Sequence, residues 1–214
     1  MTPIVCLVTD RRRAGAAWAE VLPAEVGRAA RAGVDLVQVR EPDLHGGALA
    51  ALVARCVAAV AGTRTRVVVN GRADVALAAG AHGVHLPASA PPAARVRALG
   101  PRGWLIGRSV HAAGEARAAG ADGAVDYLLL GTVFATASKP GRIPCGLAEL
   151  ARAAAASAVP VLAIGGVTLE RVHEVARTGA AGVAGIGLFA VSGEELSMAV
   201  AGVRRMFDTP RGVS

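Results

Sequence analysis

The sequence is poor in cysteine and in aromatic residues, each of which would point to a particular class of protein if it were abundant. Cysteine occurs only at Cys6, Cys56 and Cys145, too few and too scattered for a disulfide framework, and no CxxC pair suggests zinc. Aromatic residues make up only 3% of the chain, so we expect a core of Ala, Val and Leu. Because nucleic-acid surfaces combine clustered basic residues with stacking aromatics, we expect no nucleic-acid partner.

Long apolar stretches are also lacking. Residues 159–167 form an apolar run far shorter than the ~20 residues that cross a bilayer. The apolar start at residues 3–9 has no basic lead and continues into Asp10 and Arg11, unlike an export signal. We therefore expect no membrane association, a cytoplasmic location and, with 53% hydrophobic residues, a folded single domain over residues 1–214.

The charge is unbalanced and almost all of the positive charge is arginine. The chain has 23 Lys and Arg residues against 16 Asp and Glu, a formal net charge of +7. Lys139 is the single lysine, so the other 22 of the 23 are arginines. A positive field favours anionic ligands, from a phosphate ester upward.

Short β-rich runs alternate eight times with Ala-rich helical stretches. Expected strands cover residues 4–9, 36–40, 66–70, 83–86, 105–107, 127–131, 161–164 and 182–186. Expected helices cover residues 25–32, 47–61, 72–79, 93–99, 113–119, 147–156, 169–178 and 193–207. The strand runs are nearly continuously apolar, as is typical of parallel strands covered by helices.

This alternation predicts an α/β fold, a single (β/α)₈ TIM barrel of about 27 residues per unit. Several expected helices are followed by a short segment of small residues that contains Gly33, Gly80, Gly120 or Gly179. In each segment we expect the glycine to supply the left-handed cap of the helix. A doubly wound open sheet is the alternative, but no GxGxxG motif follows the first strand.

Active sites of such barrels lie at the carboxyl ends of the strands, so polar residues there are the candidates. His111 follows the fifth strand beside Ser109, and an imidazole can take and return a proton near neutral pH. The alternative for His111 is a loop histidine that caps the next helix. Gln38 and Arg40 alternate with Val39 and so point the same way; Arg40 would hold a carboxylate or phosphate, unless it pairs with a neighbouring carboxylate, Glu41 or Asp74.

Other strand ends supply further candidate ligand contacts. Asn70 ends the third strand, and His85 ends the fourth, where a packed wall residue is the alternative. Thr136 and Lys139 lie in the long loop after the sixth strand, which could close over an anion.

Glycine-rich loops follow the last two strands. Gly166 and the segment Gly185, Ile186 and Gly187 would let backbone N–H groups reach a phosphate, the alternative being tight turns. The nearest carboxylates to the strand ends, Glu41, Asp43 and Asp74, form no convincing pair, so we expect neither a metal nor another cofactor.

The motifs VQVRE (37–41), VNGRAD (69–74), GVHLP (83–87), IGRSVH (106–111), DYLLLG (126–131), VFAT (133–136) with Lys139, and AIGG (163–166) resemble the thiamine phosphate synthase/TenI superfamily. The match runs in order over nearly the whole chain. It implies a barrel enzyme that binds a phosphorylated thiazole.

Departures from the synthase pattern favour one of two branches. The synthase joins a pyrimidine diphosphate to thiazole phosphate with Mg²⁺, and its pattern has an Asp after Asn70, another near Ala90, and a basic residue two places after Arg40. Those places are occupied here by Gly71, by Ala90 or its neighbours, and by Pro42. Without the two acids and the basic residue, a magnesium diphosphate would be poorly held.

The same segments look like TenI, the thiazole tautomerase, which implies metal-free isomerisation of a carboxythiazole phosphate to its aromatic form. On this resemblance His111 moves the proton, Arg40 and Lys139 hold the carboxylate, Ser109 orients it, and Gly166 with residues 185–187 binds the phosphate. Two alternatives stay open: a Mg²⁺-dependent thiamine phosphate synthase, and a barrel that binds a thiamine precursor without turnover and acts on a protein partner. The exposed Ala-rich helices are compatible with a homodimer.

Overall fold

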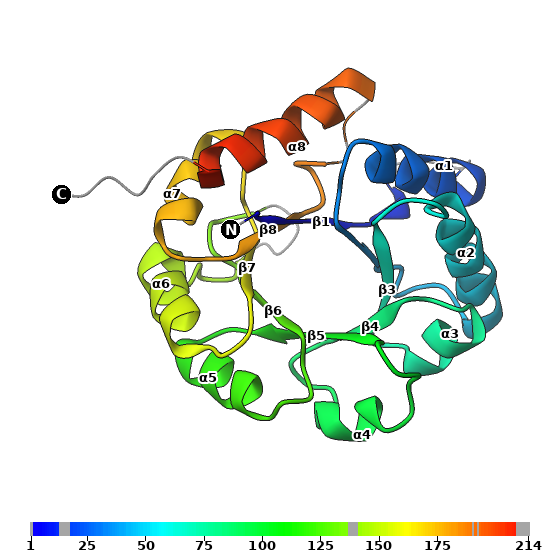
Figure 1. Ribbon diagram of the computed structural model, residues 1–214, viewed down its shortest axis with the longest axis horizontal. Coiled ribbons are helices and arrows are strands. Elements are labelled where there is room, and N and C mark those ends of the chain that lie inside the picture. The colour runs from blue at the N-terminus through cyan, green and yellow to red at the C-terminus, as the bar shows by residue number, and fades with distance from the viewer. Residues whose placement is uncertain (1, 13–17, 137–140, 190, 192, 209–214) are drawn as a thin grey trace.

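The computed structural model describes residues 2–12, 18–136, 141–189, 191 and 193–208. In this part of the chain eight parallel strands close into a barrel in the order β1 to β8. Figure 1 looks down the barrel and shows the helices as an outer ring around it. The predicted (β/α)₈ fold is confirmed.

The strands are short and lie where the apolar runs predicted them. Their bounds are β1 Ile4–Val8, β2 Leu36–Val39, β3 Arg66–Asn70, β4 Gly83–Leu86, β5 Leu105–Val110, β6 Tyr127–Leu130, β7 Val161–Ile164 and β8 Gly182–Gly185. The largest difference is in β5, which continues three residues past the predicted end. Ser109 is therefore a strand residue, held in register opposite Leu129.

The helices follow the predicted order with shifted ends. Their bounds are α1 Trp18–Arg31, α2 Gly46–Ala59, α3 Ala73–Ala78, α4 Ala93–Arg97, α5 Ala113–Ala121, α6 Gly146–Ala156, α7 Val172–Arg177 and α8 Gly193–Asp208. Helix α1 runs through Pro23, and one turn of 3₁₀ helix at Leu169–Arg171 precedes α7. No helix among the described residues is long and apolar enough to span a bilayer.

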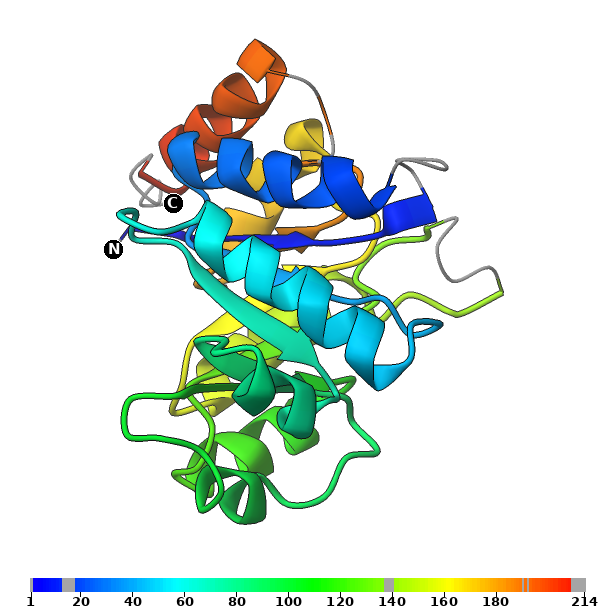
Figure 2. The same ribbon diagram turned by 90° about the vertical axis from the view of Figure 1, so that its right-hand side faces the viewer.

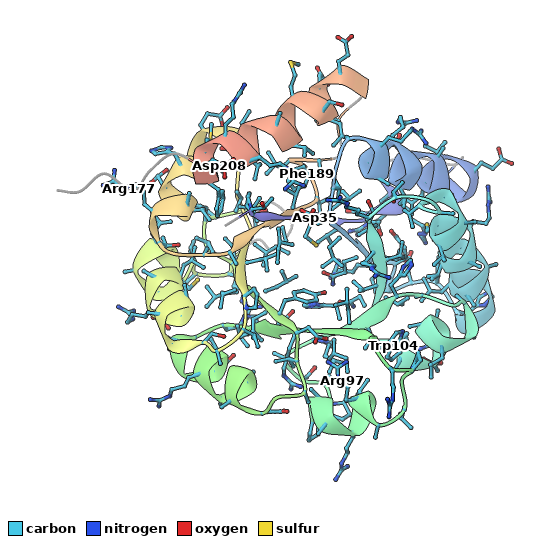
Figure 3. The ribbon with its side chains drawn as sticks, viewed as in Figure 1. Asp35, Arg97, Trp104, Arg177, Phe189 and Asp208 are labelled. Atoms are coloured by element: carbon cyan, nitrogen blue, oxygen red, sulfur yellow. The ribbon has the colours of Figure 1, made fainter. Side chains whose placement is uncertain are left out.

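Alternation along each strand divides the apolar side chains between two layers. Val37, Val67 and Val69 are buried between the sheet and the helices, and Figure 2 shows α1 and α2 side by side on the outside of the sheet. Cys6, Val68, Tyr127, Leu129 and Leu162 belong to a second cluster. This second set fills the barrel centre, where side chains converge in Figure 3, because neighbouring residues of a strand face opposite sides.

Glycine makes several of the turns from helix to strand. Gly33, Gly80 and Gly179 have φ of +90°, +65° and +85°, the left-handed cap predicted for them. The prediction for Gly120 is wrong: it lies inside α5, and Gly123 has the positive φ, +70°. A Cβ on Gly120 would lie 2.9 Å from Ser157 Oγ, so this glycine permits close packing after α6.

Candidate active site

A cavity of about 560 Å³ lies at the carboxyl ends of the strands. Most of the predicted site residues contribute to its lining, although they are scattered along the chain. They are Gln38, Arg40, Asn70, Ser109, His111, Thr136, Gly166, Gly185, Ile186 and Gly187. Their ligand contacts remain predictions, and Lys139 lies outside the described residues.

His111 is held by the strand next to its own. Its Nδ1 lies 2.6 Å from the carbonyl oxygen of Gly131, at the end of β6. Because a carbonyl can only accept, Nδ1 must carry the hydrogen, and Nε2 of the neutral ring is then the basic nitrogen. The backbone N–H of His111 donates to Glu115. The side chain does not cap α5, whose N-cap residue is Ala112, so the helix-capping alternative is excluded.

Ser109 stands above a buried polar layer. Its Oγ lies 2.9 Å from Nε2 of His85, and Nδ1 of His85 lies 3.2 Å from the hydroxyl of Tyr127. His85 is 0% exposed and is absent from the cavity lining. The expectation that His85 contacts substrate is therefore corrected: it lies one layer below, as the packed-wall alternative predicted.

Burial sets the protonation of this layer. It lowers the pKa of the His85 imidazole to about 3 and raises the pKa of the Tyr127 phenol well above its usual value, because charged forms are poorly solvated inside the barrel. Both groups are neutral at physiological pH. Gly107 makes room for the Tyr127 ring, since a Cβ on Gly107 would lie 2.1 Å from the ring carbon Cζ.

Gln38 and Asn70 form a second pair, on β2 and β3. The side-chain Nε2 of Gln38 donates to Asn70 Oδ1 at 2.9 Å. The other amide atom of Gln38, Oε1, is buried and has no partner among the described residues. An unsatisfied buried acceptor is costly, so this side of the cavity suits a ligand that brings a hydrogen-bond donor.

Arg40 forms no ion pair within the described ranges of the chain. The two carboxylates considered as its partners are engaged elsewhere. Glu41 accepts hydrogen bonds from the Thr9 hydroxyl at 2.6 Å and the Arg11 backbone at 3.1 Å, and Asp74 binds Arg72 in two hydrogen bonds of 2.8 and 2.6 Å. Arg40 lines the cavity, where an arginine suits an anionic ligand.

The loop after β7 has a backbone conformation that would be strained for any residue other than glycine. Gly165 and Gly166 have φ of +96° and +65°. A Cβ on Gly166 would lie 2.4 Å from the carbonyl oxygen of Ala135 and 2.8 Å from Cβ of Phe134. Tight-turn geometry and close packing against the loop after β6 thus both require this glycine, and the exposed backbone beside the cavity is compatible with an anion.

The places where the synthase pattern has acidic residues are occupied differently here. Gly71 has φ of +69° and carries no side chain. The loop around Ala90 is held by Arg108, whose guanidinium donates to the carbonyl oxygens of Ala88, Ala90 and Pro91, each at 3.0 Å. This loop therefore presents its backbone to an arginine and offers no carboxylate to the cavity.

The donor set does not fit a magnesium diphosphate. Among the described residues, no three His, Cys, Asp or Glu side chains lie together where they could hold a metal ion. Glu170 and Glu195 line the cavity, but they come from the β7 and β8 side, across the barrel from Asn70. Gln38 and Asn70 supply only neutral oxygens, whereas Mg²⁺ is bound through carboxylates and substrate phosphates.

Several lining residues were not predicted from sequence. They are Val8, Leu129, Gly131, Thr132, Ile164, Gly165, Val167, Thr168, Leu169, Glu170, Ala184, Leu188, Val191, Glu195 and Ala199. The apolar residues in this list cannot be told from core residues by sequence alone. The rule that weighs polar residues at strand ends does select Thr132, after β6, although no ligand contact was predicted for it, and the same rule could have found Thr168 after β7.

Comparison with known proteins places the chain in a family. Residues 5–189 match the family described as thiamine monophosphate synthase. The thiamine-phosphate synthase of Methanoculleus marisnigri is 46% identical over 169 residues, covering 78% of this chain and 78% of that protein. A putative thiamine-phosphate synthase 2 of Aquifex aeolicus is 34% identical over 187 residues, covering 87% and 97%.

A solved structure agrees with these relatives. The thiamine phosphate pyrophosphorylase of Pyrococcus furiosus superposes with a TM-score of 0.80 at 27% identity, covering 96% of this chain and 95% of that one. The resemblance read from the motifs is confirmed. The chain belongs to the thiamine monophosphate synthase family.

Proposed function

We propose that this chain is an enzyme of thiamine biosynthesis that holds a carboxythiazole phosphate in its cavity and isomerises it to the aromatic tautomer. The observation that carries this proposal is His111, whose Nδ1 is held by Gly131 at 2.6 Å, leaving Nε2 as a base in a cavity without a metal-binding cluster among the described residues. Proton transfer by one positioned imidazole needs no other cofactor.

The remaining lining residues supply groups for the two anions of this substrate. Arg40 and Ser109 would hold the ring carboxylate, together with Lys139 of the loop after β6. The backbone of Gly166 and of residues 185–187 would receive the phosphate. Arg40, Ser109, Gly166 and residues 185–187 line the same cavity.

The reaction requires only one proton to move. Nε2 of His111 takes the ring proton beside the carboxylate, and the electron pair left behind shifts through the ring toward the exocyclic double bond. The resulting imidazolium returns a proton to the exocyclic carbon, which completes the aromatic ring and restores neutral His111. Atoms and charge balance without an oxidant or a second substrate.

Thiamine phosphate synthesis is the second candidate, and the comparisons favour it over isomerisation. The relatives carry that name at identities up to 46% among those compared. Isomerisation is put first because Gly71 and the Arg108-bound loop at Ala90 supply no acidic side chain to the cavity. A synthase would need its metal ligands from elsewhere.

The test is an assay of the purified protein on the thiazole tautomer generated by thiazole synthase, with a chelator present. We expect formation of the aromatic product above the spontaneous rate, and loss of that acceleration in His111→Ala. His82→Gln is the matched control, because His82 precedes β4 at the opposite end of the barrel.

Other outcomes assign the chain differently. Thiamine phosphate formation with Mg²⁺ and both synthase substrates, without isomerisation, would establish the synthase reaction. Acceleration that survives in His111→Ala would remove His111 from its role. Tight binding of the substrate with no turnover in either assay would favour a non-catalytic binder.

A further inference from the structure

A chain of three polar side chains crosses the barrel interior below the cavity. Tyr127 on β6, His85 on β4 and Ser109 on β5 are linked by contacts of 3.2 Å and 2.9 Å. Tyr127 is 4% exposed and His85 0%, whereas Ser109 reaches the cavity. The other buried side chains of this inner cluster are apolar or cysteine.

The hydrogens of this chain can be assigned from the contacts. The Tyr127 hydroxyl is protonated and has no partner among the described residues other than His85 Nδ1, so it donates to Nδ1. His85 is neutral and has one ring hydrogen, which must then be on Nε2. Nε2–H donates to Ser109 Oγ at 2.9 Å, and the Ser109 hydroxyl hydrogen is left to point elsewhere.

We propose that Tyr127 and His85 are positioning residues that fix Ser109 as a hydrogen-bond donor toward an anionic group in the cavity. The opposite histidine tautomer would make Ser109 donate to His85 and turn its lone pairs toward the anion, which repels. The proposal deepens the proposed function, on which it rests for the identity of the anion, the substrate carboxylate.

The histidine tautomer can be measured without any substrate. Long-range ¹H–¹⁵N correlation spectra of protein labelled at its five histidines distinguish Nε2–H from Nδ1–H, and loss of one signal in His85→Gln identifies His85. We expect pure Nε2–H in the wild type and a mixture of both tautomers in Tyr127→Phe. An Nδ1–H wild type, or a pure Nε2–H tautomer in Tyr127→Phe, would overturn the proposal.

A double-mutant cycle tests whether the effect passes through Ser109. The probe is the aromatic product, carboxythiazole phosphate, and its dissociation constant is measured by calorimetry. We expect about tenfold weaker binding in Ser109→Ala, the loss of one hydrogen bond to a charged group, and about threefold or more in Tyr127→Phe. In the Ser109→Ala background Tyr127→Phe should have no further effect, because positioning residues act only through their target.

Two controls separate the possible failures. Leu162→Val truncates another side chain of the same inner cluster and should leave product affinity unchanged, so an equal loss there would mean simple loosening of the core and would overturn the proposal. Additive effects of Tyr127→Phe and Ser109→Ala would also overturn it. If the product does not bind the wild type, the proposed function fails, while the tautomer measurement still decides the positioning role.

Discussion

Replacing Gly166 with alanine should separate backbone strain from packing in the glycine loop after β7. Gly166 and Gly80 share the same φ, +65°, but their surroundings differ. A Cβ on Gly80 would meet nothing within 4 Å, whereas one on Gly166 would lie 2.4 Å from the carbonyl oxygen of Ala135. Gly80→Ala is thus a matched control that carries the same backbone strain without the clash.

The expected magnitudes follow from these two terms. Holding an alanine in the left-handed backbone region costs about 1 kcal/mol of unfolding free energy in each variant. Gly166→Ala adds the displacement of the loop that contains Phe134 and Ala135, for which overpacking costs of about 1–3 kcal/mol are typical. We expect Gly80→Ala to lose about 1 kcal/mol and Gly166→Ala about 2–4 kcal/mol of unfolding free energy.

Urea unfolding measures these losses, and calorimetry measures the affinity for carboxythiazole phosphate. Only Gly166→Ala should also weaken ligand binding, by about tenfold or more, because its loop would no longer present backbone N–H groups in place. Equal stability losses in the two variants would refute the packing argument. Unchanged ligand affinity in Gly166→Ala would refute the placement of the phosphate at this loop.

Three more changes have defined outcomes. Arg40→Leu should raise KM for the anionic substrate by tenfold or more with little change in Tm, and Arg40→Lys should recover part of the lost affinity. An equal KM in both variants and the wild type would exclude Arg40 from substrate binding. Because the folded-state pKa of His85 is lowered to about 3 from 6.5, the unfolded chain binds the extra proton between these values. His85 thus lowers stability as the pH falls from about 6.5 towards about 3, by up to about 1.4 kcal/mol per pH unit. Urea titrations of His85→Gln at different pH values should lack this component of the slope. Arg108→Gln removes the guanidinium that binds three carbonyl oxygens and should speed amide hydrogen exchange at residues 88–91, with Arg117→Gln on α5 as the control.

The fold could be predicted because it depends on patterns repeated eight times. Valine-rich runs such as Val67 to Val69 read as buried strands wherever they occur, and a missed boundary at one strand leaves the other seven intact. The errors lie where a tertiary contact decides: Gly120 serves packing at Ser157 rather than a helix cap, and β5 continues to Val110 because its pairing with Leu130 holds it.

The cavity residues could be predicted from their position, but their roles in it could not. The rule that polar residues at strand ends line the mouth identified Gln38, Arg40, Asn70 and His111 together. It also selected His85, because sequence spacing does not tell an upper layer of the barrel interior from a lower one. The link from Tyr127 through His85 to Ser109 joins three strands, and no short-range pattern marks it.

Under the proposed function, the two branches of the family differ at a few loop positions that the barrel core leaves free. Gly71 has open space, with the nearest atom, Cδ of Pro87, 3.7 Å from a Cβ placed there, and Asp tolerates left-handed backbone better than most residues. The loop could therefore accept an acid after β3. At Ala90 the situation differs, since Arg108 binds the carbonyl oxygen of that residue at 3.0 Å. A carboxylate introduced at residue 90 would lie beside a guanidinium and would pair with it before it could bind a metal ion. Under the proposed function, Arg108 would thus act together with the absent carboxylates to disfavour a magnesium diphosphate.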